Sequence, residues 1–173
     1  TVLSGVVGSS STVGEKLSSL STDAAGSTVI NGGGVYTTQA QTYADNLALG
    51  AGTSLSGSAV STLGTVVGNG NALSVTGNAV FGDGVADTLT GLSSLAVSGT
   101  TVLNTRALST TGAQSYSGVL TLGADSTLSG VGITVGGVLK SDGTNRSLVI
   151  NDAGATVLSG VVGSSSTVGE KLS

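Results

Sequence analysis

Carboxylates are the largest group of side chains in this sequence that could do chemistry. There are nine, and most stand beside Gly or Asn, a context typical of turns with an Asx cap. Residues 82–87, GDGVAD, partly match the Gly- and Asp-rich repeat of calcium rolls, but with one residue too many before the second Asp. No second copy follows to share an ion. We therefore expect a solvated turn here, with calcium at Asp83 and Asp87 as the alternative.

Two tyrosines hold matched positions in a weak internal repeat. When the segment that begins at Ser27 is aligned with the segment that begins at Thr100, Tyr43 falls on Tyr116, whereas Tyr36 falls on a serine. Such rings can form a platform for a sugar, so Tyr43 and Tyr116 are the candidate surface contacts for a glycan or another ligand. The simpler interpretation is that each amphipathic ring covers a seam between structural units, with its hydroxyl in water.

Several kinds of chemistry lack the residues they need. The sequence contains no Cys and no His, which excludes a thiolate nucleophile, an imidazole base, a usual zinc site and a disulfide framework. A glycosidase needs only two carboxylates. Its groove usually also carries basic and aromatic residues, and Lys and Arg total only five here. We expect no enzymatic activity and no cofactor.

Charge and hydropathy limit the partners. The net charge is −4, and five basic residues give no footprint for nucleic acid or for an anionic membrane. No apolar run approaches the roughly 20 residues of a membrane span, and this segment shows neither a secretion signal nor an anchor. We therefore expect no nucleic acid partner and no membrane insertion.

An identical internal repeat organises the chain. Residues 1–18 and 156–173 both read TVLSGVVGSSSTVGEKLS. We interpret residues 1–155 as one period of a tandem array and residues 156–173 as the start of the next. The weaker repeat, in which Ser27 aligns with Thr100, divides the period further. The two diverged half-periods cover about 17–91 and 92–171.

Short strands separated by turns fill each half-period. Aliphatic runs such as those at 73–75, 119–122 and 147–150 are mostly bounded by Gly, Asn, Asp or Ser. Related runs recur at steps of roughly 20 residues or slightly more, a spacing typical of repeat proteins. Strands this short bury a core only when they stack, and a stack needs every N–H, which suits a chain without proline. The pattern predicts an all-β fold: a right-handed parallel β-helix (β-solenoid) of roughly 20-residue coils, about eight per period.

A resemblance supports this fold. Residues 92–104, LSSLAVSGTTVLN, and 107–139, ALSTTGAQSYSGVLTLGADSTLSGVGITVGGVL, resemble the β-strand repeats of giant secreted bacterial surface proteins of the haemagglutinin-like and autotransporter type. The resemblance implies a β-helical shaft, export to the cell surface, and a role in adhesion or fibre building. It implies no catalytic residues.

We therefore expect a non-catalytic structural segment of a long extracellular filament or surface shaft. Its partner would be itself, through tandem or end-to-end stacking, with lateral bundling as a further contact. Two alternatives stay open. The chain could be an adhesin module that binds a glycan or a protein of a host or partner cell. It could instead be a subunit that polymerises end to end, with residues 156–173 completing the open coil of a neighbour.

Overall fold

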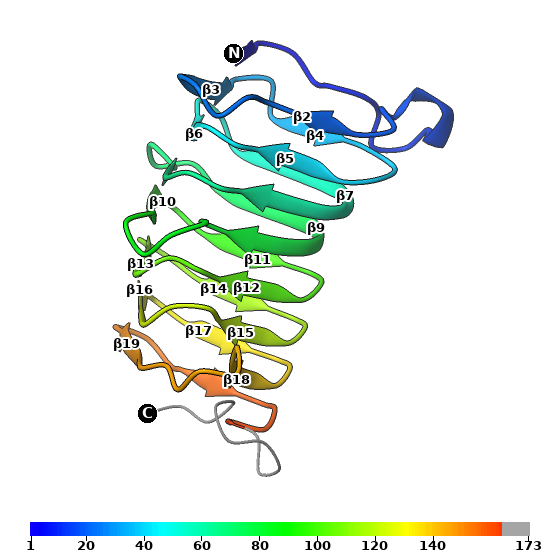
Figure 1. Ribbon diagram of the computed structural model, residues 1–173. Coiled ribbons are helices and arrows are strands. Elements are labelled where there is room, and N and C mark those ends of the chain that lie inside the picture. The colour runs from blue at the N-terminus through cyan, green and yellow to red at the C-terminus, as the bar shows by residue number, and fades with distance from the viewer. Residues whose placement is uncertain (164–173) are drawn as a thin grey trace.

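The computed structural model is an all-β solenoid of about seven turns (Figure 1). It describes residues 1–163. Every strand ladder is parallel, because each strand pairs with the strand one turn before it and the strand one turn after it. Within these residues, the one helical element is the short 3-10 turn η1 (Val13–Glu15), on a loop of the first turn. The all-β class and the stacked architecture expected from the sequence are confirmed.

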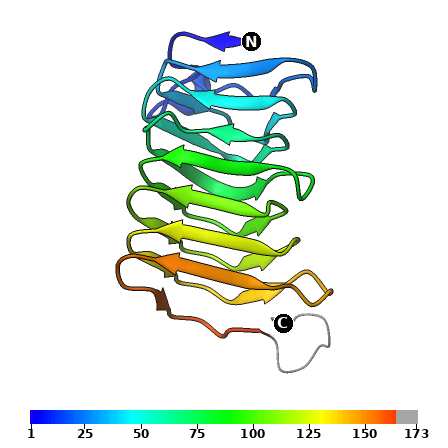
Figure 2. The same ribbon diagram turned by 90° about the vertical axis from the view of Figure 1, so that its left-hand side faces the viewer.

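One side of the solenoid is an eight-stranded sheet, here called face A, which Figure 2 shows from the front. Its strands, in spatial and chain order, are β1 (Val2–Leu3), β3 (Ser27–Ile30), β6 (Asn46–Leu49), β8 (Val66–Val67), β10 (Thr88–Leu92), β13 (Ala107–Thr110), β16 (Ser126–Gly130) and β19 (Leu148–Asp152).

Register partners in face A give the length of each turn. One column of paired residues, one member from each turn, runs through Thr28, Leu47, Val66, Leu89, Leu108, Leu128 and Ile150. Its spacing confirms the predicted step of about 20 residues per turn. Some turns are longer, such as the one from Val66 to Leu89, and the stack therefore has about seven turns where about eight were expected.

The other side is a bent twelve-stranded sheet that forms two faces. Face B consists of β4 (Gly34–Tyr36), the first halves of β7 (Thr53–Thr62) and β9 (Leu73–Phe81), β11 (Leu95–Val97), β14 (Gln114–Tyr116), β17 (Ile133–Val135) and β20 (Val157–Leu158). Face C consists of β2 (Leu20–Ser21), β5 (Gln41–Tyr43), the second halves of β7 and β9, β12 (Thr101–Leu103), β15 (Leu120–Leu122) and β18 (Leu139–Ser141). The chain visits the faces in the order A, B, C in every turn.

The two long strands show how faces B and C are joined. β7 pairs with β4 through its first half and with β5 through its second half, and its ladder with β9 shifts register between Ser56 and Ala59. Gly77 lies at the same corner one turn later, with φ of +128°. A Cβ at Gly77 would also collide with the carbonyl oxygen of Gly57, so the corner requires glycine for two independent reasons.

The core runs along the inside of all three faces. Strand side chains alternate between buried and more exposed, as in β15, β17 and β18, because successive residues of a strand point to opposite sides. Leu, Val and Ile fill most of the interior, and the buried hydrophobic side chains form one continuous cluster. In the part of the chain that the structure describes, no helix has the length and hydropathy to cross a bilayer.

Candidate functional site

The two tyrosines expected at the surface are buried. Tyr43 on β5 and Tyr116 on β14 both have 0% of their surface exposed, so the prediction that they are surface contacts is wrong. Each ring points inward because its strand position alternates with an outward one. Burial raises the pKa of both phenols above the ordinary value. Neither ring can form a platform for a sugar.

A glutamine two residues earlier makes this burial possible. The Tyr43 hydroxyl donates to Gln41 Oε1 at 2.9 Å, and the Tyr116 hydroxyl donates to Gln114 Oε1 at 3.0 Å. A buried hydroxyl without a partner would be costly, so the glutamine removes the need for water at the ring's polar end. The matched Gln and Tyr pairs were visible in the sequence, but their inward direction was not.

Each glutamine also joins two turns of the solenoid. Gln41 Nε2 donates to the Ser56 carbonyl oxygen of the next turn at 2.9 Å, and Gln114 Nε2 donates to the Ser129 carbonyl oxygen at 2.8 Å. The same amide nitrogen donates to a corner threonine hydroxyl in both places, at 3.3 and 3.2 Å. The tyrosines therefore belong to a polar cluster that fills a corner of the core, and that cluster is built twice.

The calcium candidates lie in the loop before β10. Asp87 Oδ2 accepts hydrogen bonds from the backbone amides of Asp83 and Gly84, both at 3.1 Å. These contacts make the Asp87 carboxylate a cap that closes its own loop. Residues 1–163 contain no group of three or more acidic, His or Cys side chains arranged to hold a metal ion.

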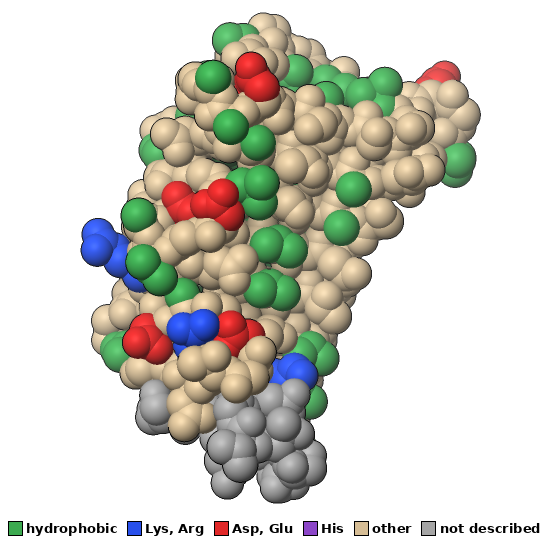
Figure 3. Space-filling model, viewed as in Figure 1, with side chains coloured by type: hydrophobic (Ala, Val, Ile, Leu, Met, Phe, Trp, Pro, Cys, Tyr) green, Lys and Arg blue, Asp and Glu red, His purple; other side chains and the backbone are tan. Residues whose placement is uncertain are grey.

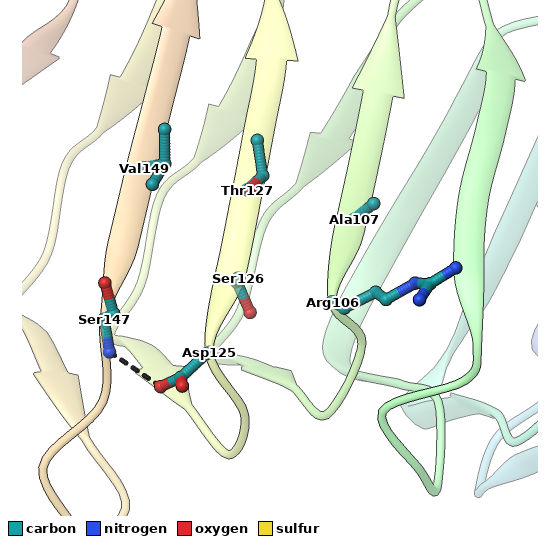
Figure 4. Close-up of a pocket in the computed structure, with 7 residues that line it drawn as sticks. All are labelled: Arg106, Ala107, Asp125, Ser126, Thr127, Ser147 and Val149. Carbon is teal, nitrogen blue, oxygen red and sulfur yellow. Dashed lines mark hydrogen bonds between the residues drawn. The ribbon is translucent and has the colours of Figure 1, made fainter.

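Face A has a shallow groove across three strands (Figure 4). Its volume is about 370 Å³, and it is lined by Arg106, Ala107, Asp125, Ser126, Thr127, Ser147 and Val149. Asp125 Oδ1 accepts the Ser147 backbone amide at 2.8 Å, and the Ser126 hydroxyl donates to the Thr105 carbonyl oxygen at 2.7 Å. Both polar groups thus hold the corner of the solenoid.

The surface shown in Figure 3 is sparsely charged, with acidic and basic side chains in small separate groups and no extended basic patch among the described residues. Arg146 forms an ion pair with Asp142 at 2.9 Å. This pair lies within a single loop and is partly exposed, so it contributes little to stability.

At both ends of the solenoid, the inward-facing apolar residues of the repeated segment are only partly covered. At the first turn, Leu3 and Val7 are only partly buried, whereas their register partners Ile30 and Val35 are fully buried. At the last turn, Leu158 and Val162 of the second copy are 39% and 49% exposed, whereas their register partners Val135 and Leu139 are buried. We call these two surfaces the end faces; in Figure 1 they lie at opposite ends of the stack.

Strand pairing is also incomplete at the end faces. Among residues 1–163, β1 pairs only with the following strand β3, and β20 pairs only with the preceding strand β17. Within those residues, each of these strands has one edge without a strand partner, and such an edge can add a further parallel strand. The end faces are the candidate functional site of this molecule.

Asp152 positions the second copy at its end face. Its carboxylate accepts the backbone amides of Gly132 at 2.7 Å and Ile133 at 2.9 Å, at the start of β17. It also accepts the Gly154 amide and the Thr156 hydroxyl, both at 2.8 Å, where the second copy begins. These hydrogen bonds lower the pKa of Asp152 to about 2. The sequence marked Asp152 only as a turn residue.

Comparison of the chain with protein-family models, with curated proteins and with solved structures gives no match.

Proposed function

We propose that this chain is a structural, non-catalytic segment of a long extracellular filament or surface shaft built from tandem β-solenoid periods. The observation that carries the proposal is the pairing of the repeated segment. Its first copy pairs with the strand that follows it, β3, and its second copy pairs with the strand that precedes it, β17. A copy inside a tandem array would make both pairings at once.

The side chains of the repeated segment could pack against both neighbouring turns at such a junction. Leu3 is the register partner of Ile30, and Leu158 is the register partner of Val135. Ile30 and Val135 are both buried. A leucine between an Ile30-like and a Val135-like residue would continue the inner column of the core without a break. Full burial of a leucine contributes roughly 1.5–3 kcal/mol, so several such side chains stabilise the junction appreciably.

Location at the cell surface is part of the same proposal. It is supported by the resemblance of residues 92–104 and 107–139 to the strand repeats of giant secreted bacterial surface proteins. The adhesin alternative has lost its main support, because the two tyrosines that would have contacted a glycan are buried. We therefore do not propose glycan binding at these residues.

The proposal is tested with proteins of one, two and three tandem periods. At roughly 4.8 Å per turn, a period of a little over seven turns adds about 35 Å to the length. Small-angle X-ray scattering should show the maximum dimension growing by that step, with an unchanged cross-section. Flexibly linked particles, or no regular increment, would contradict the proposal.

End-to-end assembly of separate chains is a second candidate, favoured by the partly covered core residues and by the strand edges that lack a partner among residues 1–163 at both end faces. Sedimentation of the one-period protein over a range of concentrations separates the two. Growth into rods with concentration supports polymerisation, whereas a stable monomer leaves covalent tandem repetition as the route to a filament.

A further inference from the structure

The two copies of the repeated segment lie on different faces of the solenoid. In the first copy, β1 belongs to face A, and Val7 forms a bridge with Val35 of face B. In the second copy, β20 belongs to face B, and Val162 forms a bridge with Leu139 of face C. The same residues have therefore moved forward by one face.

The number of strand positions in a period explains the move. We count one strand position for each passage of the chain along one face. β20 is 19 strands after β1, and β7, β9 and the Val7 bridge each add one position, because β7 and β9 occupy two faces and Val7 occupies face B of the first turn. The chain therefore advances 22 strand positions from β1 to β20. Three positions make one turn, so a period is seven and one third turns. The excess of one third of a turn places the next period one face ahead.

The half-period repeat shows that this sequence tolerates such a change of face. The alignment of Ser27 with Thr100 takes β3 of face A onto β12 of face C, and β4 of face B onto β13 of face A. Counted in the same way, the step is 11 strand positions, half of the full period. Eleven positions make three and two thirds turns, so the half-period, like the full period, is not a whole number of turns.

Local structure survives the change of face in detail. The Gln41 and Tyr43 cluster fills the corner before face C, whereas the Gln114 and Tyr116 cluster fills the corner before face B. The hydrogen bonds from tyrosine to glutamine measure 2.9 and 3.0 Å, and those from the corner threonine hydroxyls, Thr37 and Thr110, to the carbonyls two residues on measure 2.7 Å in both. A corner is thus specified by its own residues and by the next turn, whichever face it joins.

We propose that consecutive periods in a tandem array stack through their end faces with each period advanced by one face, so that the same surface returns to the same face only every third period. This inference rests on the tandem-array function proposed above and specifies its geometry. The partner of each end face is the neighbouring period, whose β3 copy continues face B next to β20. Any feature of face A, including the groove at Arg106 and Asp125, then lies on face B in the next period and on face C in the one after.

Disulfide trapping in a two-period protein tests the geometry. The chain has no Cys, so each pair of introduced cysteines is the only pair present. Register partners on neighbouring turns lie within the Cα separation that a disulfide spans. Thr134 and Val157 are such partners on face B. The variant Thr134→Cys with Val157→Cys should therefore cross-link on oxidation. A within-period control, Ser115→Cys with Thr134→Cys, joins partners on β14 and β17.

The competing geometry has its own pair. If periods were related by seven whole turns, the second-period copy of β3 would continue face A next to β19, with the copy of Val29 beside Asn151. Cysteines at Asn151 and at that copy should stay reduced in the proposed arrangement. A cross-link there would overturn the one-face advance and leave the tandem array standing. A control that cross-links while neither junction pair does would overturn the advance as well. The scattering experiment tests independently whether the periods form a continuous array.

Discussion

A single side chain decides whether this core can bury a polar group. The pair Gln41 and Tyr43 shows this, as does its counterpart Gln114 and Tyr116. A tyrosine ring supplies a large apolar volume, but its hydroxyl requires a partner when no water reaches it. The glutamine oxygen supplies that partner, and the glutamine nitrogen binds the next turn. One side chain thus satisfies a neighbour and holds two coils together.

Loss of the tyrosine hydroxyl should destabilise the fold. In Tyr43→Phe, Gln41 Oε1 loses its buried donor, and an unsatisfied buried acceptor costs about 1–3 kcal/mol. Tyr116→Phe should behave in the same way. Urea unfolding followed by circular dichroism measures both effects. The control is Tyr36→Phe, which we expect within about 0.5 kcal/mol of the parent because Tyr36 lies on the outer side of its strand. Equal effects at all three positions would contradict the role of the glutamine.

Asp152 should make the stability depend on pH in the acid range. Its folded-state pKa of about 2 lies below the roughly 3.9 of an unfolded aspartate, so folding favours the ionised form. This contribution is fully present above about pH 4 and is lost as the pH falls towards 2. In Asp152→Asn, the fall in urea midpoint between pH 5 and pH 2.5 should be smaller than in the parent. Asp23→Asn, at an exposed position, is the control and should leave that fall unchanged.

Strands and corners carry different constraints in this fold. The strands need only alternation and ladder hydrogen bonds, which many Val, Leu and Thr combinations provide. The corners need particular backbone conformations and close approaches between turns. Gly57 and Gly77 stack at the corner between faces B and C with no room for a side chain on Gly77.

A side chain at that corner should therefore be costly. Gly77→Ala combines a strained positive φ, worth about 1–3 kcal/mol, with a collision against the Gly57 carbonyl. Thermal unfolding should show a clear decrease in Tm. The matched control is Gly52→Ala, where an added Cβ meets no atom within 4 Å and φ is not in the left-handed region. Gly52→Ala should be neutral or slightly stabilising. A neutral Gly77→Ala would show that the corner adjusts.

The solenoid as a whole behaves as a linear stack, in which each turn contacts only its neighbours. The end turns are therefore its weakest part, since they lack one neighbour and expose apolar side chains that an inner turn would cover. When the stack is extended by a further period, residues at its former end should contribute more to the free energy of unfolding, although their sequence is unchanged.

Leu158 provides a measurement of that change. It is 39% exposed in the last turn, but in a tandem protein it would lie between Val135 and the next copy of Ile30. Leu158→Ala should cost less than about 1 kcal/mol in the one-period protein and about 2–5 kcal/mol in the two-period protein. Chemical denaturation of the four proteins gives the comparison. The same cost in both backgrounds would mean that the second period does not cover this end face.

The sequence alone determined the separation of the two identical segments, the strand spacing and the scarcity of side chains suited to catalysis or metal binding. These follow from identical residues, from the recurrence of aliphatic runs and from composition, all of which are local or countable properties. The sequence did not reveal that Tyr43 and Tyr116 are buried, because their matched positions are equally consistent with either side of a strand. It also did not reveal which face each strand occupies. The face of a strand depends on the length and bend of every preceding corner, so it can be assigned only once the whole stack is built. The third of a turn in excess is therefore a property of the tertiary structure, although every residue that produces it is in the sequence.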